Sequence, residues 1–164
     1  FSGPPDGPIR TAMSENETAI AYLTTQVMSA SPEQLRLLLL EGSVRFARQA
    51  KDCLERGNHE GAHSGLTQCR NIILELINTI RPDANPELAE RVKSLYTFFY
   101  QELVESSFKK DPQRVGKVIE LLEYEVETWK LLLEELAQKG ETTSADMPEP
   151  TPTTRDGGSL SNQA

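Results

Sequence analysis

Three positions in the sequence place a helix-capping side chain directly before a proline, and this pattern constrains the fold more than any other feature. The three pairs are Ser31-Pro32, Asn85-Pro86 and Asp111-Pro112. The side-chain oxygen of such a residue accepts a hydrogen bond from a backbone N–H in the first turn of a helix. Proline at the first helical position loses no hydrogen bond, because its missing N–H would have no helical partner there. Each pair therefore predicts the start of a helix.

Long segments with the helical period follow these starts. Gln34 is placed to complete a capping box with Ser31, and Gly57-Asn58 predicts the end of one helix and the start of the next. We expect helices over residues 32–56, 59–81, 86–109 and 112–138. Because the connections are short, consecutive helices must run in opposite directions. The predicted fold class is all-α, an antiparallel up-down four-helix bundle.

Upstream of the bundle lies a further amphipathic segment, from Ser14 to Met28. Its apolar residues Ile20, Leu23 and Val27 share one face, and Tyr22 lies beside them. A helix of about fifteen residues is marginal alone in water. We expect it to dock on the bundle as a short N-terminal helical segment, a lid that a partner could displace.

Gly and Pro gather near both ends of the sequence and divide it into three parts. Residues 1–13 are predicted to be a flexible N-terminal tail, and residues 14–139 a helical-bundle domain. Residues 140–164 are predicted to be a disordered, acidic tail rich in Pro, Ser and Thr, because they have too few apolar residues to offset the entropy of ordering.

Charge and composition argue against several classes of protein. The formal net charge is −8, with 17 Lys and Arg against 25 Asp and Glu, whereas a nucleic-acid-binding protein needs a basic face. No apolar stretch approaches the roughly 20 residues of a membrane-spanning helix, so no membrane insertion is expected. Cys53 and Cys69 are too few for a disulfide scaffold. We therefore expect a cytoplasmic protein with two buried thiols.

The segment 32–56 carries apolar residues on two sides. Leu35, Leu39, Gly42, Phe46 and Cys53 form one stripe with the spacing of a core face, and Leu37, Leu40, Val44 and Ala47 form a second strip on the other side. One interpretation is an inner helix of the bundle, with a broad buried face. The other is a groove that binds a partner. The aromatic group of segment 86–109 adds Tyr96 and Tyr100 as weaker candidates for the same role.

The sequence His59-Glu60-Gly61-Ala62-His63 matches a zinc-binding pattern of hydrolases. A zinc hydrolase would use His59 and His63, but it also needs a third protein ligand, which nothing in the sequence identifies. The motif also falls at a helix start beside two glycines, so an exposed, solvated helix start is the favoured interpretation. We expect no catalytic residue, metal ligand or cofactor.

Four separate segments of the sequence resemble the flagellin export chaperone family, FliS. Tyr22, Val27, Ala30-Ser31-Pro32 and the leucine run to Leu39 are similar to the family's opening motif and first long helix. The three later segments occur in the family's order, with matching loop lengths. The first is 71–76, and the last is Trp129-Lys130. The segment between them carries three short motifs, Leu95-Tyr96, Leu103-Val104-Glu105 and Lys109-Lys110-Asp111.

The resemblance implies a non-enzymatic cytoplasmic chaperone that binds the disordered C-terminal segment of flagellin in apolar grooves. It further implies that the chaperone prevents premature polymerisation and assists delivery to the flagellar type III export apparatus, where an export-gate component is a possible partner. The expected partner-binding residues are the lid residues Tyr22 and Val27, the strip Leu37, Leu40, Val44 and Ala47, and the aromatic residues Tyr96 and Tyr100. The alternative is a self-associating structural or adaptor bundle; the expected state is a monomer or a weak homodimer.

Overall fold

The computed structural model describes residues 9–83 and 85–145 of the 164-residue chain. The regular structure of these residues is entirely helical. The helices are α1 (Ile9–Ser29), α2 (Pro32–Glu55), α3 (His59–Asn78), α4 (Pro86–Lys109) and α5 (Pro112–Ala145). The all-α prediction is confirmed, and the starts of α2, α3, α4 and α5 lie at the predicted residues.

The three predicted cap-and-proline pairs all form helix starts. The Ser31 hydroxyl accepts a hydrogen bond from the Gln34 backbone N–H over 3.2 Å, and the Gln34 side chain accepts one from the Ser31 N–H over 3.0 Å. Asn85 accepts from the backbone N–H of Leu88, and Asp111 from those of the first turn of α5. Each cap contributes about 1 kcal/mol, because it satisfies a backbone donor that the helix itself cannot.

The turn between α2 and α3 follows the same local chemistry. Gly57 has φ +72°, a left-handed conformation that glycine adopts without steric cost. The Asn58 side chain then accepts a hydrogen bond from the backbone N–H of Gly61 over 3.0 Å and caps α3. The turn reverses the chain within a few residues and sets α3 antiparallel to α2.

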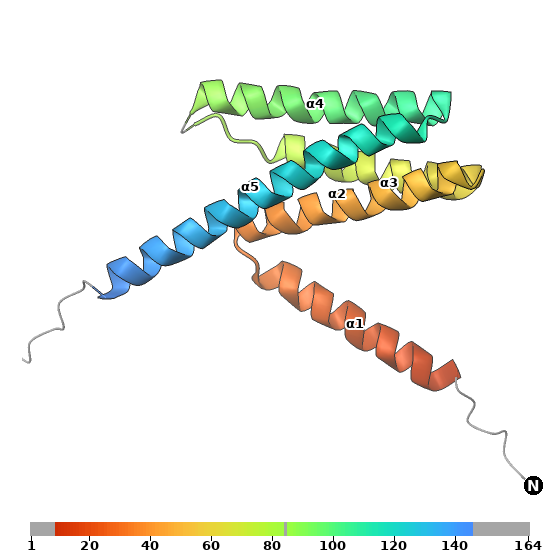
Figure 1. Ribbon diagram of the computed structural model, residues 1–164. Coiled ribbons are helices and arrows are strands. Elements are labelled where there is room, and N and C mark those ends of the chain that lie inside the picture. Colours follow the sequence, from red (N-terminus) through yellow and green to blue (C-terminus); the bar gives the residue numbers. More distant parts are fainter. Residues whose placement is uncertain (1–8, 84, 146–164) are drawn as a thin grey trace, which may run out of the picture.

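Helices α2 to α5 form an antiparallel up-down bundle around one core (Figure 1). α2 packs against both α3 and α5, and α4 closes the ring by packing against α3 and α5. The largest fully buried side chains come from all four helices and include Tyr96, Phe99, Leu40, Leu66, Ile73, Leu76, Leu103 and Leu122. The predicted four-helix bundle is therefore confirmed.

α1 does not dock on the bundle, contrary to the expectation from the sequence. It leaves the start of α2 and runs away from the other helices (Figure 1), and its apolar side chains are exposed. The reason lies on α2, whose outward side carries the exposed polar residues Arg45, Gln49 and Asp52. This side of α2 offers no apolar surface on which α1 could pack.

Three helix bounds also differ from the prediction by more than one residue. α3 ends at Asn78 instead of residue 81. α1 begins at Ile9, inside the segment predicted to be a tail, and α5 continues to Ala145 instead of ending near residue 138. Gly140 does not stop α5, because it keeps the helical conformation and the next proline is Pro148. The remaining parts of both predicted tails, residues 1–8 and 146–164, lie outside the described residues.

Candidate partner-binding surfaces

The predicted apolar strip on α2 belongs to the core. Leu40 and Ala47 are 0 % exposed and Val44 is 8 % exposed, while Leu37 is half-buried. The expectation that these residues line an open strip is wrong, because α2 is an inner helix of the bundle. α2 packs against both α3 and α5, and this packing covers Leu40, Val44 and Ala47. Leu35 and Leu39, near the start of α2, stay half-buried.

The two aromatic candidates on α4 lie in different environments. Tyr96 is fully buried, and its hydroxyl donates a hydrogen bond to Oε2 of Glu125 over 3.3 Å. Burial, together with the Glu125 carboxylate, raises the pKa of Tyr96 to about 12. Tyr100 is half-buried and lines a shallow depression on α4 with Gln101, Glu102, Val104 and Glu105. Only Tyr100 therefore has surface to offer a partner.

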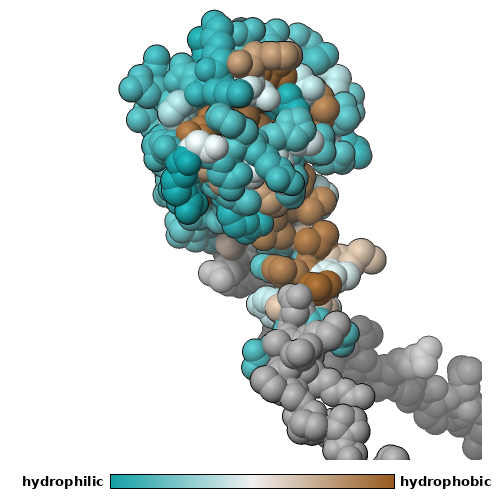
Figure 2. Space-filling view, turned by 90° about the vertical axis from the view of Figure 1, so that its right-hand side faces the viewer, coloured by the Kyte–Doolittle hydropathy of each residue, from teal (hydrophilic) through white to brown (hydrophobic). Residues whose placement is uncertain are grey.

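The two candidates on α1 are exposed. Tyr22 is 70 % exposed and Val27 is 47 % exposed, and Val27 shares a shallow apolar depression with Ile20, Leu23 and Met28. Figure 2 shows apolar residues gathered along this part of the molecule, below the largely hydrophilic surface of the bundle. A set of exposed apolar side chains on one face is a candidate surface for contact with another polypeptide.

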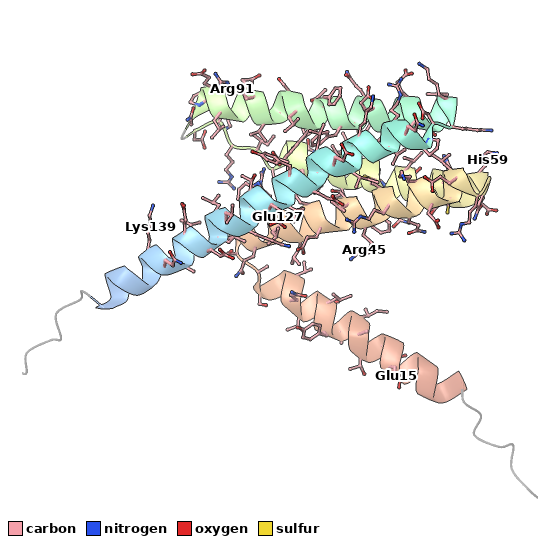
Figure 3. All side chains as sticks on the ribbon, in the orientation of Figure 1. Glu15, Arg45, His59, Arg91, Glu127 and Lys139 are labelled. Atoms are coloured by element: carbon pink, nitrogen blue, oxygen red, sulfur yellow. The ribbon has the colours of Figure 1, made fainter. Side chains whose placement is uncertain are left out.

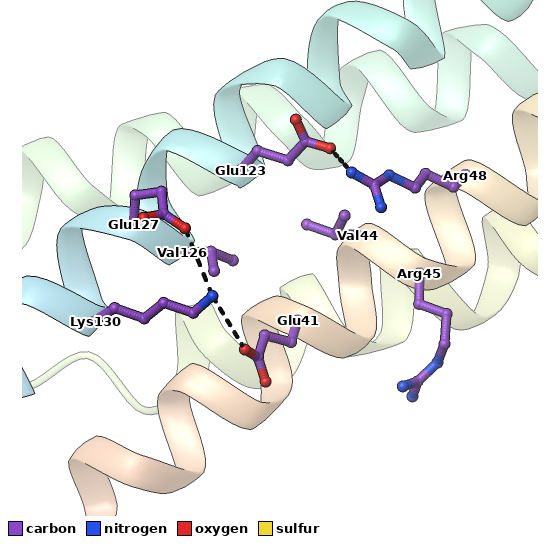
Figure 4. A pocket seen from close by; sticks show the side chains of 8 residues that line it. All are labelled: Glu41, Val44, Arg45, Arg48, Glu123, Val126, Glu127 and Lys130. Atoms are coloured by element: carbon purple, nitrogen blue, oxygen red, sulfur yellow. Dashed lines mark hydrogen bonds and ion pairs between the residues drawn. The ribbon is translucent and has the colours of Figure 1, made fainter.

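The seam between α2 and α5 holds a cleft of about 630 Å³ (Figure 4). Its walls are charged: Arg48 pairs with Glu123, and Nζ of Lys130 lies 3.5 Å from Oε1 of Glu127 and 3.8 Å from Oε1 of Glu41. Val44 and Val126 also line it. Arg45 points away from the seam in Figures 3 and 4. Since opposite charges already pair across it, a partner that entered this cleft would have to displace ion pairs between α2 and α5.

A second cleft, of about 500 Å³, lies where α2 begins and α3 ends. Half-buried Leu35, Leu39 and Trp129 supply its apolar lining. The guanidinium of Arg36 lies 5.2 Å from the centroid of the Trp129 ring, and its Nη2 donates a hydrogen bond to Oγ1 of Thr79 over 3.1 Å. We call this the bundle-end cleft.

The last part of α5 adds a further apolar surface near the bundle-end cleft. α5 leaves the bundle beyond the starts of α2 and α4 (Figure 1), and every residue from Leu131 to Gly140 except Leu133 is exposed. We call residues 131–140 the overhang. The core stripe of α5 continues along it through Leu132, Leu133 and Leu136, because these residues keep the helical spacing after their neighbouring helices have ended.

Neither the bundle-end cleft nor the overhang is predicted as a site by the sequence. The spacing of Leu35 and Leu39 predicts that both belong to a core stripe, and the sequence predicts the last helix only as a range, 112–138. The predicted helix lengths already indicate the overhang, because the last helix is predicted to be longer than its neighbours. A core stripe that runs past the start of an antiparallel neighbour has nothing to pack against.

The histidine pair lies at the opposite end of the bundle, where Figure 3 labels His59. His59 and His63 are exposed and border a small pocket of about 160 Å³ that also contains Lys110. Within residues 9–83 and 85–145, no group of three His, Cys, Asp or Glu side chains is placed to hold a metal ion. The exposed helix start that the sequence favoured is therefore what the structure shows.

Both cysteines are free and buried, as predicted. Burial raises the pKa of the Cys69 thiol to about 12, and its Sγ donates a hydrogen bond to the backbone carbonyl of Ser43 over 3.3 Å. A thiol in this state packs and does not act as a nucleophile. Among the described helices, none is long and apolar enough to cross a membrane.

These observations define a class: a helical-bundle protein whose unsatisfied surfaces are apolar helix faces, suited to binding another polypeptide. Comparison with known proteins gives the family. The family model described as "Flagellar protein FliS" matches residues 14–136. The flagellar secretion chaperone FliS of Bacillus subtilis (strain 168) is 32 % identical over 98 residues, which cover 60 % of this chain and 72 % of the relative.

Two further comparisons agree. The flagellar secretion chaperone FliS of Campylobacter jejuni is 29 % identical over 118 residues, covering 72 % of this chain and 92 % of the relative. A crystal structure of a bacterial flagellar chaperone superimposes with a TM-score of 0.61 and 15 % identity, covering 74 % of this chain and 98 % of that one, and supports the fold. The chain belongs to the FliS family, a family of flagellar secretion chaperones.

Proposed function

We propose that this protein is a flagellar secretion chaperone that binds the unstructured C-terminal segment of flagellin. Family membership supports the proposal, and so does the gathering of exposed apolar side chains at one end of the bundle. The bound segment is kept from polymerising early, and the complex is then delivered to the export apparatus through a contact with an export-gate component. The protein acts by binding, not by catalysis.

The surfaces that support this proposal differ from those expected from the sequence. With Leu40 and Ala47 in the core, the binding residues are Leu35, Leu39 and Trp129 of the bundle-end cleft. The apolar face of α1 and the overhang extend this surface. A partner segment that becomes helical on binding places apolar residues at every third or fourth position, which matches a cleft between helices.

Titration calorimetry with a peptide covering the C-terminal segment of flagellin tests the proposal. Wild-type protein should bind with a negative heat-capacity change, because apolar surface leaves water on binding. Leu35→Asp places a charge in the bundle-end cleft and should weaken binding about tenfold or more, which corresponds to about 1.4 kcal/mol. Circular dichroism on the same variant checks that the helices remain.

Leu74→Asp provides a matched control. Leu74 is an exposed leucine on α3 that lines neither the bundle-end cleft nor the charged seam. Its replacement should leave the dissociation constant within about twofold, since a surface change away from an interface has little effect on binding. Absence of binding by the wild-type protein, or equal weakening by both variants, would contradict the proposal.

A further inference from the structure

The line along which α3 packs against α4 can be traced from a pocket at one end of it. His63 of α3 and Ser107 of α4 border the same small pocket. The two helices are antiparallel, so seven residues forward along α3 correspond to seven residues back along α4. Seven residues make nearly two full turns and return each helix to the same side. Arg70 is therefore level with Tyr100, and Lys93 follows one further step along α4.

These residues form a continuous side of the bundle together with Lys110, which borders the same pocket as His63. We call this side the α3–α4 face; its residues are His63, Arg70, Lys93, Tyr100, Ser107 and Lys110. From Lys93 to Lys110 the face is about 25 Å long, because a helix rises by about 1.5 Å per residue. The face shares no residue with the bundle-end cleft or with the cleft between α2 and α5.

Arg70 is half-buried at the middle of this face and forms no ion pair with a residue of the described chain. Its Nη2 donates a hydrogen bond to Oγ1 of Thr67 over 3.3 Å. Its Nε is buried and has no hydrogen-bond partner among the described residues. A guanidinium carries five donors in fixed directions, so a single such bond leaves most of them unused. A carboxylate that approaches from solvent can accept from the donors that remain exposed.

The other polar groups of the face are also cations or hydroxyls. Lys93 and Lys110 are exposed, and neither takes part in an ion pair within residues 9–83 and 85–145. The side chains of Tyr100 and Ser107 are half-buried, and their hydroxyls make no hydrogen bond to another described residue. The face therefore offers positive charge and hydrogen-bond donors that this chain does not use.

The carboxylates next to the face on α4 pair with other cations. Glu102 lies 3.0 Å from Arg114 of α5, and Glu105 lies 3.4 Å from Lys109. The opposite side of the helix ring is the seam between α2 and α5, where charges pair across the two helices. Within the described chain, charge is thus balanced along one seam of the bundle and left unbalanced along the other.

We infer that the α3–α4 face binds an acidic amphipathic helix of another protein. Carboxylates at every seventh position of such a helix stand about 10.5 Å apart, which is the same step that separates Tyr100 from Lys93 along α4. A small anion reaches only one of these levels, whereas a helix reaches them all. Val104 lies one turn from Tyr100 and is half-buried, so it adds an apolar contact for the same helix.

The overall charge of the chain makes this attraction local. The formal net charge is −8, so an acidic segment is repelled by most of the molecule. Exposed charges act over about 10 Å at 0.1 M salt, which confines the attraction to the α3–α4 face. Charge complementarity of this kind fixes orientation and partner choice. The inference concerns a surface outside the bundle-end cleft, so its failure leaves the proposed function standing.

Fluorescence anisotropy with two designed peptides tests the face on the full chain. The first is a labelled helical peptide with glutamate at every seventh position and leucine beside it, and the second has glutamine in place of those glutamates. At low ionic strength the wild-type protein should bind the glutamate peptide about tenfold more tightly, because opposite charges attract across the contact. Added salt should reduce this preference. Equal binding of the two peptides would overturn the inference.

Replacing single cations locates the site. Arg70→Gln and Lys93→Gln should each weaken binding of the glutamate peptide by about three- to tenfold, since each removes one opposite charge from the contact. Neither should change binding of the glutamine peptide. Lys93 is exposed, so its replacement does not threaten the fold, and circular dichroism checks the helicity of the Arg70→Gln variant. Unchanged binding in both variants would overturn the inference.

Arg45→Gln is the matched control. Arg45 is exposed on the outer side of α2 and forms no ion pair with a described residue, so its replacement removes the same charge at a distant place. Binding of the glutamate peptide should stay within about twofold of the wild-type value, because salt screens a distant charge. Equal weakening by Arg45→Gln and Arg70→Gln would show that net charge alone sets the affinity, which would overturn the assignment to this face.

Two competitors complete the test. A single-stranded oligodeoxynucleotide with the charge of the glutamate peptide should compete weakly, because it lacks the leucines and the helical spacing. Stronger competition than by unlabelled glutamate peptide would overturn the choice of a polypeptide partner. A peptide covering the C-terminal segment of flagellin should leave the glutamate peptide bound, because the two surfaces share no residue. Displacement by the flagellin peptide would overturn the separate face.

Discussion

α1 and α2 are adjacent amphipathic helices, yet one lies exposed and the other forms part of the core. Only residues 30 and 31 separate them. α2 contacts both α3 and α5, and its Leu40 and Ala47 are 0 % exposed. α1 has a similar density of apolar residues, but its Leu23 is 57 % exposed.

The difference shows that apolar residues on a helix are left over for binding only if the fold places too few neighbouring helices beside them. α2 has two neighbouring helices in the bundle and needs two apolar arcs to pack against them. α1 has one apolar face and no neighbour within the described chain. The helix with one apolar face therefore exposes more of its apolar residues than the helix with two, and it is the better candidate for binding another polypeptide.

The largest expected effect on stability comes from replacing a leucine by alanine on α2, with the same replacement on α1 for comparison. Leu40→Ala should lower the free energy of unfolding by about 2–5 kcal/mol, because it leaves a cavity in a packed core. Leu23→Ala on α1 should change it by no more than about 0.5 kcal/mol, as expected for a surface position. Urea denaturation of both variants at a concentration where the protein is monomeric measures the contrast. Similar losses in both would show that α1 packs on the bundle in solution.

Arg36 extends the comparison, because this one side chain of α2 interacts with residues of α3, α4 and α5. Its guanidinium hydrogen-bonds Thr79 at the end of α3, stacks on Trp129 of α5, and lowers the pKa of Tyr96 on α4 and of Glu125 through its charge. Arg36→Ala should cost about 1–2 kcal/mol, since it removes a hydrogen bond to exposed Thr79 and the stacking on half-buried Trp129.

Arg36→Lys is the control for charge. It retains the cation but loses the planar group that stacks and donates in fixed directions, so only part of the stability should return. Chemical denaturation of the two variants separates these contributions. Full recovery in the lysine variant would show that the stacking on Trp129 and the bond to Thr79 contribute nothing measurable.

The Ser31 cap, which lies between α1 and α2, gives a smaller expected effect on stability. This effect should be felt by α2 and not by α1. Ser31 caps α2, and its hydroxyl makes no recorded bond to α1. Ser31→Ala should lower the free energy of unfolding by about 1 kcal/mol, as for other lost caps. The loss should appear in amide hydrogen exchange at the first turn of α2 and not along α1. Faster exchange along α1 instead would mean that the cap also holds α1 in place.

Much of the fold could be predicted from local chemistry. The helix starts at Pro32, Pro86 and Pro112 follow from single capping residues and prolines, which act within one turn and need no tertiary context. The end of α5 could not be predicted as well. Gly140 weakens a helix without ending it, and the residues that follow give no strong stop before Pro148.

The candidate site was harder to predict, because exposure depends on where neighbouring helices end. Val27 and Tyr22 are exposed as a binding surface requires, whereas Leu40 has the same spacing and lies in the core. A helical wheel assigns each residue a direction but not a neighbour. Leu136 shows the reverse error: its core spacing predicts burial, but α5 has already left the bundle there.

The smallest expected effect concerns the Glu125 carboxyl of α5, which lies close enough to Arg36 of α2 for the Arg36 charge to lower its pKa. Burial raises the pKa of Glu125, although the Tyr96 hydroxyl and the Arg36 charge both lower it. A carboxyl whose pKa is higher in the folded state favours folding in its protonated form. Its contribution is fully present below the unfolded pKa and is lost as the pH rises through the folded pKa.

Glu125→Gln should therefore stabilise the protein at neutral pH and make no difference near pH 4, close to the ordinary pKa of glutamate. The gain should stay below about 1 kcal/mol, since the carboxylate is partly exposed and screened by water. Thermal unfolding across this pH range measures it. In the protein that keeps Glu125, Arg36→Ala should make the free energy of unfolding depend more strongly on pH, because removing the cation raises the pKa of the Glu125 carboxyl further. If Glu125→Gln lowers stability at neutral pH, the ionised carboxylate stabilises the bundle, and the attraction between α2 and α5 at this point is electrostatic.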